Sequence, residues 1–274
     1  MINIKQLKLP NISEAGRQAL ELVSDNLIEM SYLADYLGKD PIISAVILKY
    51  VNSPVHRRAC EINSVRNAVS LLGLKTCKMI IGVTILQTYK SAPSEVTEKI
   101  WNHSISVATV ARLLAEKIYP ALSDEIETTA LMHDMGMLVL ASSFPDTYPG
   151  IINECIANQT PLSETELQIY GITHNTVIDY LAPILKLPSI TTGTIHDFNS
   201  HEKLLKVISD KEKHLVICHL AHHVVQKYEN YVGVDTAMND HIAHDLESLA
   251  ILLNLSDNQL KDLMEDSEIM LDIL

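Results

Sequence analysis

Apolar residues recur at intervals of three and four along most of this chain, which is the spacing of one face of an α-helix. Residues 95–118 are expected to form a long amphipathic helix, and further helices are expected over residues 74–89, 212–228, 240–254 and 257–271. No stretch shows the regular alternation typical of a β-strand. About a dozen helices are therefore expected, and the predicted fold class is all-α, a multi-helix bundle.

Several glycine and serine residues mark the expected ends of these helices. Gly38, Gly73 and Gly171 each follow an apolar segment and are expected to terminate it. Ser123 and Ser256 precede helical segments and are expected to act as N-caps. Residues 163–166, Ser-Glu-Thr-Glu, match a capping box.

The sequence Ser91-Ala92-Pro93-Ser94 breaks the helical pattern and is the best candidate for a domain boundary. We expect an N-terminal helical segment over residues 1–92 and a second helical region over residues 93–274. The same pattern also allows one continuous domain.

Charge and composition restrict the functional classes. The chain has 34 acidic and 21 basic residues, a formal net charge of −13. Affinity for nucleic acid depends on Lys and Arg, so neither nucleic acid nor an anionic membrane is an expected partner. The four cysteines lie far apart in the sequence, and no apolar run reaches the length of a membrane span. The expected location is the cytoplasm.

The dipeptide His133-Asp134 stands inside an apolar run, residues 128–140, that is expected to be a buried helix continuing to about Ser143. Charged side chains are rarely fully buried unless they are paired or bind a metal. Adjacent positions of a helix point about 100° apart, so a site that uses both side chains needs ligands from other helices.

The order and spacing of motifs in residues 9–73 resemble the HDOD family, the HD-related output domains of bacterial signalling. The matching motifs are Leu9-Pro10, Asp40-Pro41, Asn52-Ser53-Pro54, Ile62-x-Ser64 and Ala68-x-x-Leu71-Leu72-Gly73. Residues 101–226 resemble the helical core of the HD superfamily. The resemblance implies an N-terminal helical subdomain packed on an HD-like core.

HD-superfamily phosphohydrolases hold a divalent metal with one histidine, a His-Asp pair and a distant aspartate. The resemblance assigns these positions to His103, His133 and Asp134, and it places His222 where the aspartate would be expected. Imidazole suits iron, zinc or nickel, whereas hard cations prefer oxygen ligands. The expected cofactor is a divalent metal (Fe, Zn, Ni or Mn), or none.

Other polar residues could contribute to such a site. His174 and His196 resemble ligand positions of the cyclic-dinucleotide phosphodiesterase branch and are weak ligand-binding candidates. Arg112 and Lys186 are candidate phosphate-binding residues, and Asp197 or Asp235 could fold back as a late carboxylate. Further histidine sets could bind metal, but exposure on an acidic helix is the favoured interpretation; they comprise His219, His222 and His223, and His241, His244 and Asp245.

Two functions follow from this resemblance. The first is a non-catalytic signalling module that binds a protein partner or a ligand, with its input coming from a separate chain. The second is a metal-dependent phosphohydrolase for nucleotides or cyclic dinucleotides, in which Asp134 would be the catalytic residue. The sequence favours the first, because the expected fourth ligand is not an acid.

Overall fold

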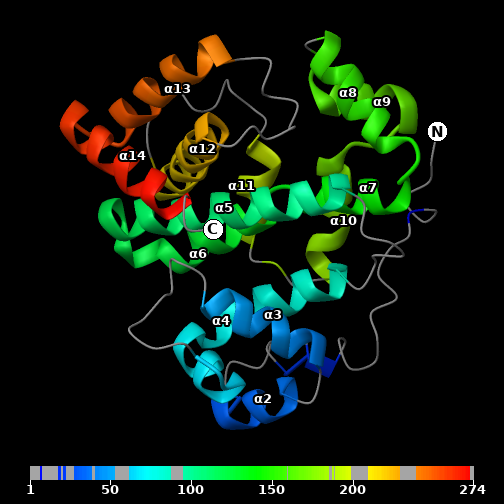
Figure 1. Cartoon of the computed structure of the whole chain (residues 1–274), viewed down its shortest axis with the longest axis vertical. Coiled ribbons are helices and arrows are strands. Elements are labelled where there is room, and N and C mark those ends of the chain that lie inside the picture. Colours follow the sequence, from blue (N-terminus) through cyan, green and yellow to red (C-terminus); the bar gives the residue numbers. More distant parts are fainter. Residues whose placement is uncertain are drawn as a thin grey trace. The chain divides into compact units, whose positions relative to one another are not determined.

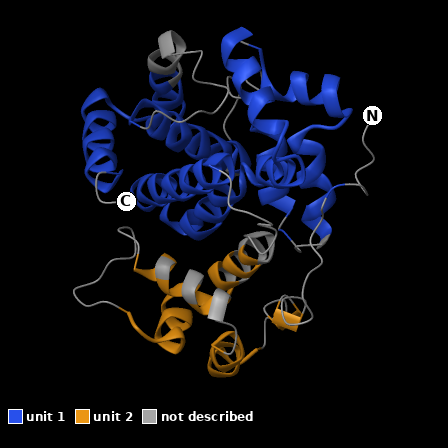
Figure 2. Cartoon of the chain, turned by 45° about the vertical axis from the view of Figure 1, so that its right-hand side comes forward, with its two compact units in different colours: residues 1–8, 92–273 blue, residues 9–91, 274 orange. Residues whose placement is uncertain are grey.

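A computed structural model gives the fold of residues 7, 18–19, 21–22, 28–38, 41–52, 62–87, 95–158, 160–184, 187, 189–198, 209–228 and 239–271. These described residues form helices and no strand, which confirms the predicted all-α fold class (Figure 1). The chain divides into two compact units, residues 9–91 with 274, and residues 1–8 with 92–273 (Figure 2). The sequence-based division at residues 92 and 93 lies next to this boundary.

The unit of residues 9–91 contains α2 (Met30–Leu37), α3 (Pro41–Val51) and α4 (Val65–Gln87). Helix α4 packs against both α2 and α3. Gly73 adopts a φ of 74° and a ψ of 172°, which breaks the helical path within α4 as the sequence predicts. The Asn52 side chain accepts a hydrogen bond from the Ile62 N–H and donates one to the Ile62 carbonyl, so it ties the end of α3 to the segment that precedes α4.

The larger unit is built around α5 (Glu95–Ile118) and α12 (Asp210–Tyr228), which pack against each other. Helix α5 also packs against α6 (Ser123–Met132), α7 (Met135–Ser143) and α14 (Asp257–Leu271). Helix α12 also contacts α6, α11 (Ser189–Asp197), α13 (Asn239–Leu252) and α14. The remaining helices are α8 (Tyr148–Asn158), α9 (Leu162–Tyr170) and α10 (His174–Ile184).

Two helix starts differ from the sequence prediction. Ser123 does not cap α6: a 3-10 turn, Pro120–Leu122, precedes it, and the Ser123 hydroxyl donates back to the Pro120 carbonyl. Residues 163–166 do not form a capping box, because α9 already begins at Leu162 and Glu166 turns inward to distant partners. The Ser256 cap is confirmed, since the Ser256 hydroxyl accepts from the Gln259 N–H.

The larger difference is at His133. The apolar run of residues 128–140 is not one helix, because α6 ends at Met132 and α7 begins at Met135. Among the described helices, none is both long and apolar enough to span a membrane.

Candidate metal centre

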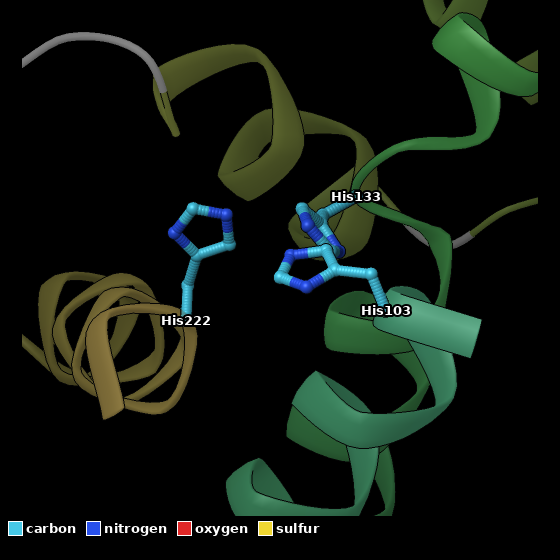
Figure 3. A group of neighbouring side chains, drawn as sticks. All are labelled: His103, His133 and His222. Atoms are coloured by element: carbon cyan, nitrogen blue, oxygen red, sulfur yellow. The ribbon is translucent and has the colours of Figure 1, made fainter. Parts of the chain in front are cut away.

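Three histidines from separate parts of the larger unit converge on one point: His103 from α5, His133 from the turn between α6 and α7, and His222 from α12 (Figure 3). Their ring centres lie 5.5, 5.0 and 5.2 Å apart. One nitrogen of each ring lies within 4.8 Å of the others. Their exposed fractions are 1%, 4% and 5%, so the centre is almost closed to bulk water.

The amphipathic pattern of α5 explains the position of His103. Its buried positions include Ile100, His103, Val107, Val110 and Leu114, which recur at helical spacing. His103 is therefore the one histidine on the inward face of the helix that packs against α6, α7 and α12. The sequence places it there without any need for a long-range signal.

The helical path is interrupted at His133 and Asp134, and this interruption positions both side chains. Asp134 has a φ of −97° and a ψ of 12°, outside the helical range, and the Leu138 N–H bonds to its carbonyl as α7 begins. The expected divergence of about 100° between adjacent helical positions does not apply at a turn. The Asp134 carboxylate consequently lies against its neighbour, with Oδ2 3.1 Å from Nε2 of His133.

Gly136 permits the turn to approach α10. A Cβ atom at this position would lie 2.0 Å from the carbonyl oxygen of His174 and 2.7 Å from its carbonyl carbon. Both distances are far below van der Waals contact. The glycine therefore allows the start of α7 to lie directly on the backbone of the first residue of α10, and it brings His174 beside the His-Asp pair.

The backbone sets the tautomer of His133. Its Nδ1 lies 2.6 Å from the carbonyl oxygen of Ala130, so Nδ1 carries the proton and donates it. The lone pair of the neutral ring is then on Nε2, the nitrogen nearest Asp134. A backbone carbonyl that holds the remote nitrogen is a common partner of metal-binding histidines.

The charges of the centre are strongly coupled. Burial would lower the pKa of His133, but the Asp134 carboxylate and the Ala130 carbonyl outweigh burial, and the pKa is raised. Burial would raise the pKa of Asp134, but His133, His103 and His174 outweigh it and lower that pKa to about 2. Without an ion, both shifts favour the charged forms of His133 and Asp134.

His222 has the opposite tendency. Burial and the neighbouring imidazoles of His103 and His133 hold its pKa well below the usual value. A neutral imidazole is the form that binds a metal. His222 is therefore suited to donate a nitrogen lone pair at neutral pH.

His174 lies beside the His-Asp pair and is fixed by a buried acid. Its backbone N–H donates to Oε2 of Glu166 over 2.8 Å, and its Nδ1 lies 2.7 Å from the same oxygen. The Tyr148 hydroxyl donates to the other oxygen of Glu166 over 2.6 Å. Glu166, expected from the sequence to belong to a capping box, instead accepts the hydrogen bonds of His174 and Tyr148 and joins α8, α9 and α10.

Phe198, which follows α11, covers the centre and was not anticipated from the sequence. Its ring centre lies 5.1 Å from that of His133 and 5.2 Å from that of His222. It also stacks on His219, with ring centres 4.1 Å apart and an angle of 10°. An apolar ring thus packs against His133, His219 and His222.

The other sequence candidates lie elsewhere. His196 is 59% exposed, with its ring nitrogens 3.9 Å from Asp179 and 3.7 Å from Asp197, and it does not join the three histidines. Arg112 is bound by three carboxylates, those of Glu116, Asp124 and Glu127, so it is not available to hold a phosphate. Lys186 and Asp235, and the side chains of His241, His244 and Asp245, lie outside the described residues.

The favoured interpretation of the α12 histidines as exposed was wrong. His219, His222 and His223 are 3%, 5% and 7% exposed. The signal that could have shown this is the apolar sequence around them: Leu215, Val216, Ile217, Leu220, Val224 and Val225 cover every side of the helix, which is typical of a buried helix.

The donor set fits a transition metal. Nitrogens bonded at about 2.1 Å around a tetrahedral ion place the ring centres about 5 Å apart, which agrees with the three observed separations. His103, His133 and His222 could hold the ion as three imidazoles, whereas the Asp134 carboxylate contacts His133 and is not part of this group. Three imidazoles favour zinc, iron or nickel over magnesium.

The fold is shared with several solved bacterial structures. The chain is similar to an HDOD domain protein with unknown function from Geobacter sulfurreducens (TM-score 0.69, 21% identity, 97% of this chain and 90% of the other). It is also similar to a protein from Shewanella amazonensis SB2B named "Putative metal-dependent phosphohydrolase" (0.67, 17%, 97% and 93%). A third, named "Putative signal transduction protein", is from Marinobacter aquaeolei VT8 (0.61, 19%, 95% and 59%).

At these identities the likeness shows the fold alone. No curated protein matches the sequence. The family model for the HDOD domain matches residues 9–196, more than half of the chain and including His103, His133 and Asp134. The chain therefore belongs to the HDOD domain family.

Proposed function

We propose that this protein is a non-catalytic signalling module whose histidine centre holds a divalent transition metal and whose helical body acts on a protein partner. The observation that carries the proposal is the composition of the centre, which consists of three buried imidazoles with the Asp134 carboxylate beside His133 and the apolar ring of Phe198 against them. The family assignment supports the signalling role.

The arrangement of charges favours holding an ion over hydrolysing a phosphate. Asp134 is the carboxylate of the centre, and the nearby Glu166 is already committed to His174 and Tyr148. A phosphoryl group also needs cationic or N–H donors, and Arg112 is occupied by its three carboxylates. The centre is therefore better suited to a structural or signal-reading ion than to turnover.

A metal-dependent phosphohydrolase is the second candidate. The specific observation in its favour is that His103, His133 and Asp134, the positions expected from the HD superfamily, do lie together. When bound, a divalent ion supplies Lewis acidity toward a phosphoryl oxygen. In this alternative Asp134 would help to hold the ion, and Phe198 would have to move before a substrate could enter.

One experiment distinguishes the two candidate functions. Tag-free protein, purified without chelator, is analysed for metal content and tested against a panel of phosphodiesters with Mn²⁺. The proposal expects bound metal in the wild type and no hydrolysis that depends on Asp134. Asp134→Ala is compared with Asp146→Ala, which removes an exposed carboxylate. Turnover that is lost only in Asp134→Ala would contradict the proposal and favour the hydrolase.

A further inference from the structure

Helix α12 carries a buried polar strip next to the first centre. The strip consists of His219, His222, His223 and Gln226, whose spacings of three, four and seven place them on one face. All four are at least nine-tenths buried. His222 belongs to the first centre, but the other three have no role in it.

His219 and His223 are arranged as a chelating pair. Their rings lie one helical turn apart, with centres separated by 6.2 Å and planes inclined by 26°. A tetrahedral ion would place the two ring centres about 5 Å apart, so the rings must approach each other by about 1 Å, through small side-chain rotations, to share an ion. The spacing of four residues is also that of the two histidines in helical zinc motifs. Phe198 stacks on the face of His219, which leaves the nitrogen-bearing edge of that ring uncovered by the phenyl group.

Gln226 is an independent indication of a missing ligand. It is 5% exposed, yet neither its amide oxygen nor its amide nitrogen has a hydrogen-bond partner in the structure. A buried amide without partners is costly, and most such groups bind an ordered water or an ion. Gln226 lies three residues after His223 and seven after His219, so its side chain extends over the same strip.

We propose that His219 and His223 form a second divalent-metal site, with the Gln226 amide as its third polar group. Two imidazoles and an amide oxygen suit zinc, nickel, copper or cobalt. The site is separate from the centre of His103, His133 and His222, and it stands or falls independently of the function proposed for that centre. A bound water at Gln226, with no metal, is the competing explanation.

Metal stoichiometry tests the proposal. Tag-free apoprotein is titrated with Co²⁺, and binding is followed by visible absorption and by metal analysis after gel filtration. The wild type is expected to bind two equivalents. His223→Leu is expected to bind one, and Gln226→Leu is expected to bind the second equivalent about tenfold to a hundredfold more weakly. His196→Leu, which removes an exposed histidine, should still bind two.

The outcomes separate the two sites. Loss of one equivalent in His223→Leu but not in His222→Leu would support the second site and would argue against metal binding at the centre of His103, His133 and His222. The reverse result, or a single equivalent in the wild type that His223→Leu retains, would overturn the proposal. If His223→Leu does not fold, ¹⁵N NMR of the wild-type histidine rings replaces it. The ring nitrogens of His219 and His223 should shift with one equivalent, and unchanged signals would overturn the proposal.

Discussion

Replacing Gly136 with alanine should destabilise the larger unit strongly, because the new methyl group has no space. The Cβ atom would lie 2.0 Å from the carbonyl oxygen, 2.7 Å from the carbonyl carbon and 2.9 Å from the Cα of His174. All three are backbone atoms, which cannot rotate away as a flexible side chain can. The start of α7 must therefore move more than about 1 Å away from α10 to restore contact distances near 3.4 Å.

The magnitude follows from two opposing effects. Alanine in place of glycine within a helix favours folding by about 0.5–1 kcal/mol. Overpacking of a closely packed interface costs about 1–3 kcal/mol and sometimes more. Because the contact is with backbone, we expect the upper part of that range and a net loss of about 2 kcal/mol in the free energy of unfolding.

Gly150 provides a matched control. It also lies within a helix, α8, but a Cβ atom there would meet nothing within 4 Å. The same substitution should therefore stabilise by about 0.5–1 kcal/mol. Urea unfolding followed by the fluorescence of Trp101, the single tryptophan, compares the two variants. Equal midpoints for Gly136→Ala and the wild type would refute the close approach of α7 to His174.

Three further substitutions test other parts of the larger unit. Glu166→Ala leaves the Tyr148 hydroxyl and both donors of His174 without their acceptor, and urea unfolding should show a loss of about 3–5 kcal/mol. Burial lowers the pKa of His214 to about 4 in the folded protein, whereas an unfolded histidine titrates near 6.5. Protonation of the unfolded chain should therefore lower the free energy of unfolding by about 3 kcal/mol as the pH falls from 6.5 to 4. His214→Gln should lose this pH dependence. Phe198→Ala uncovers the histidine centre, and a chelator should then remove bound metal several times faster than from the wild type.

Each of these has its own control. Glu166→Gln keeps the shape and one of the two acceptor oxygens, so it should cost less than alanine, and equal losses would show that the hydrogen bonds are unimportant. Glu125 lies near His214 and opposes its pKa shift, so Glu125→Gln should leave the pH dependence in place. Phe144→Ala removes a ring that stacks on Tyr170 away from the centre. Metal release that is as fast in Phe144→Ala as in Phe198→Ala would contradict the covering role.

Local sequence patterns predicted the long helices well. Helix α5 begins at Glu95 and ends at Ile118, and α14 runs from Asp257 to Leu271, as the amphipathic periodicity indicated. Gly171 ends α9 in the left-handed conformation, with a φ of 76°. These features depend on residues within one or two turns of each other, so a single sequence contains the information.

The break at His133 could not be predicted from periodicity. The run of residues 128–140 is buried on every side, so apolar residues occur at nearly every position. Such a run has no helical periodicity, and a turn within it therefore causes no visible change in the pattern. Gly136 was visible in the sequence, but a glycine is required there because of the close contact with His174, which lies nearly forty residues later. Only the folded chain shows that contact.

The three histidines of the centre were named from family resemblance, and the structure brings them together. Glu166 and Phe198 were missed for different reasons. Glu166 fits a local capping motif, but the buried donors of Tyr148 and His174 compete for it. Phe198 has no local pattern at all, since its role arises from stacking against α12.

X-ray absorption at the edge of the bound metal tests the central claim most directly. We predict that the atoms bonded to the metal are mostly nitrogen and that the multiple-scattering pattern is that of at least three imidazoles. In His222→Ala the pattern should correspond to fewer imidazoles. A shell made of oxygen ligands, unchanged in that variant, would contradict the account of the centre as a histidine-held transition-metal site.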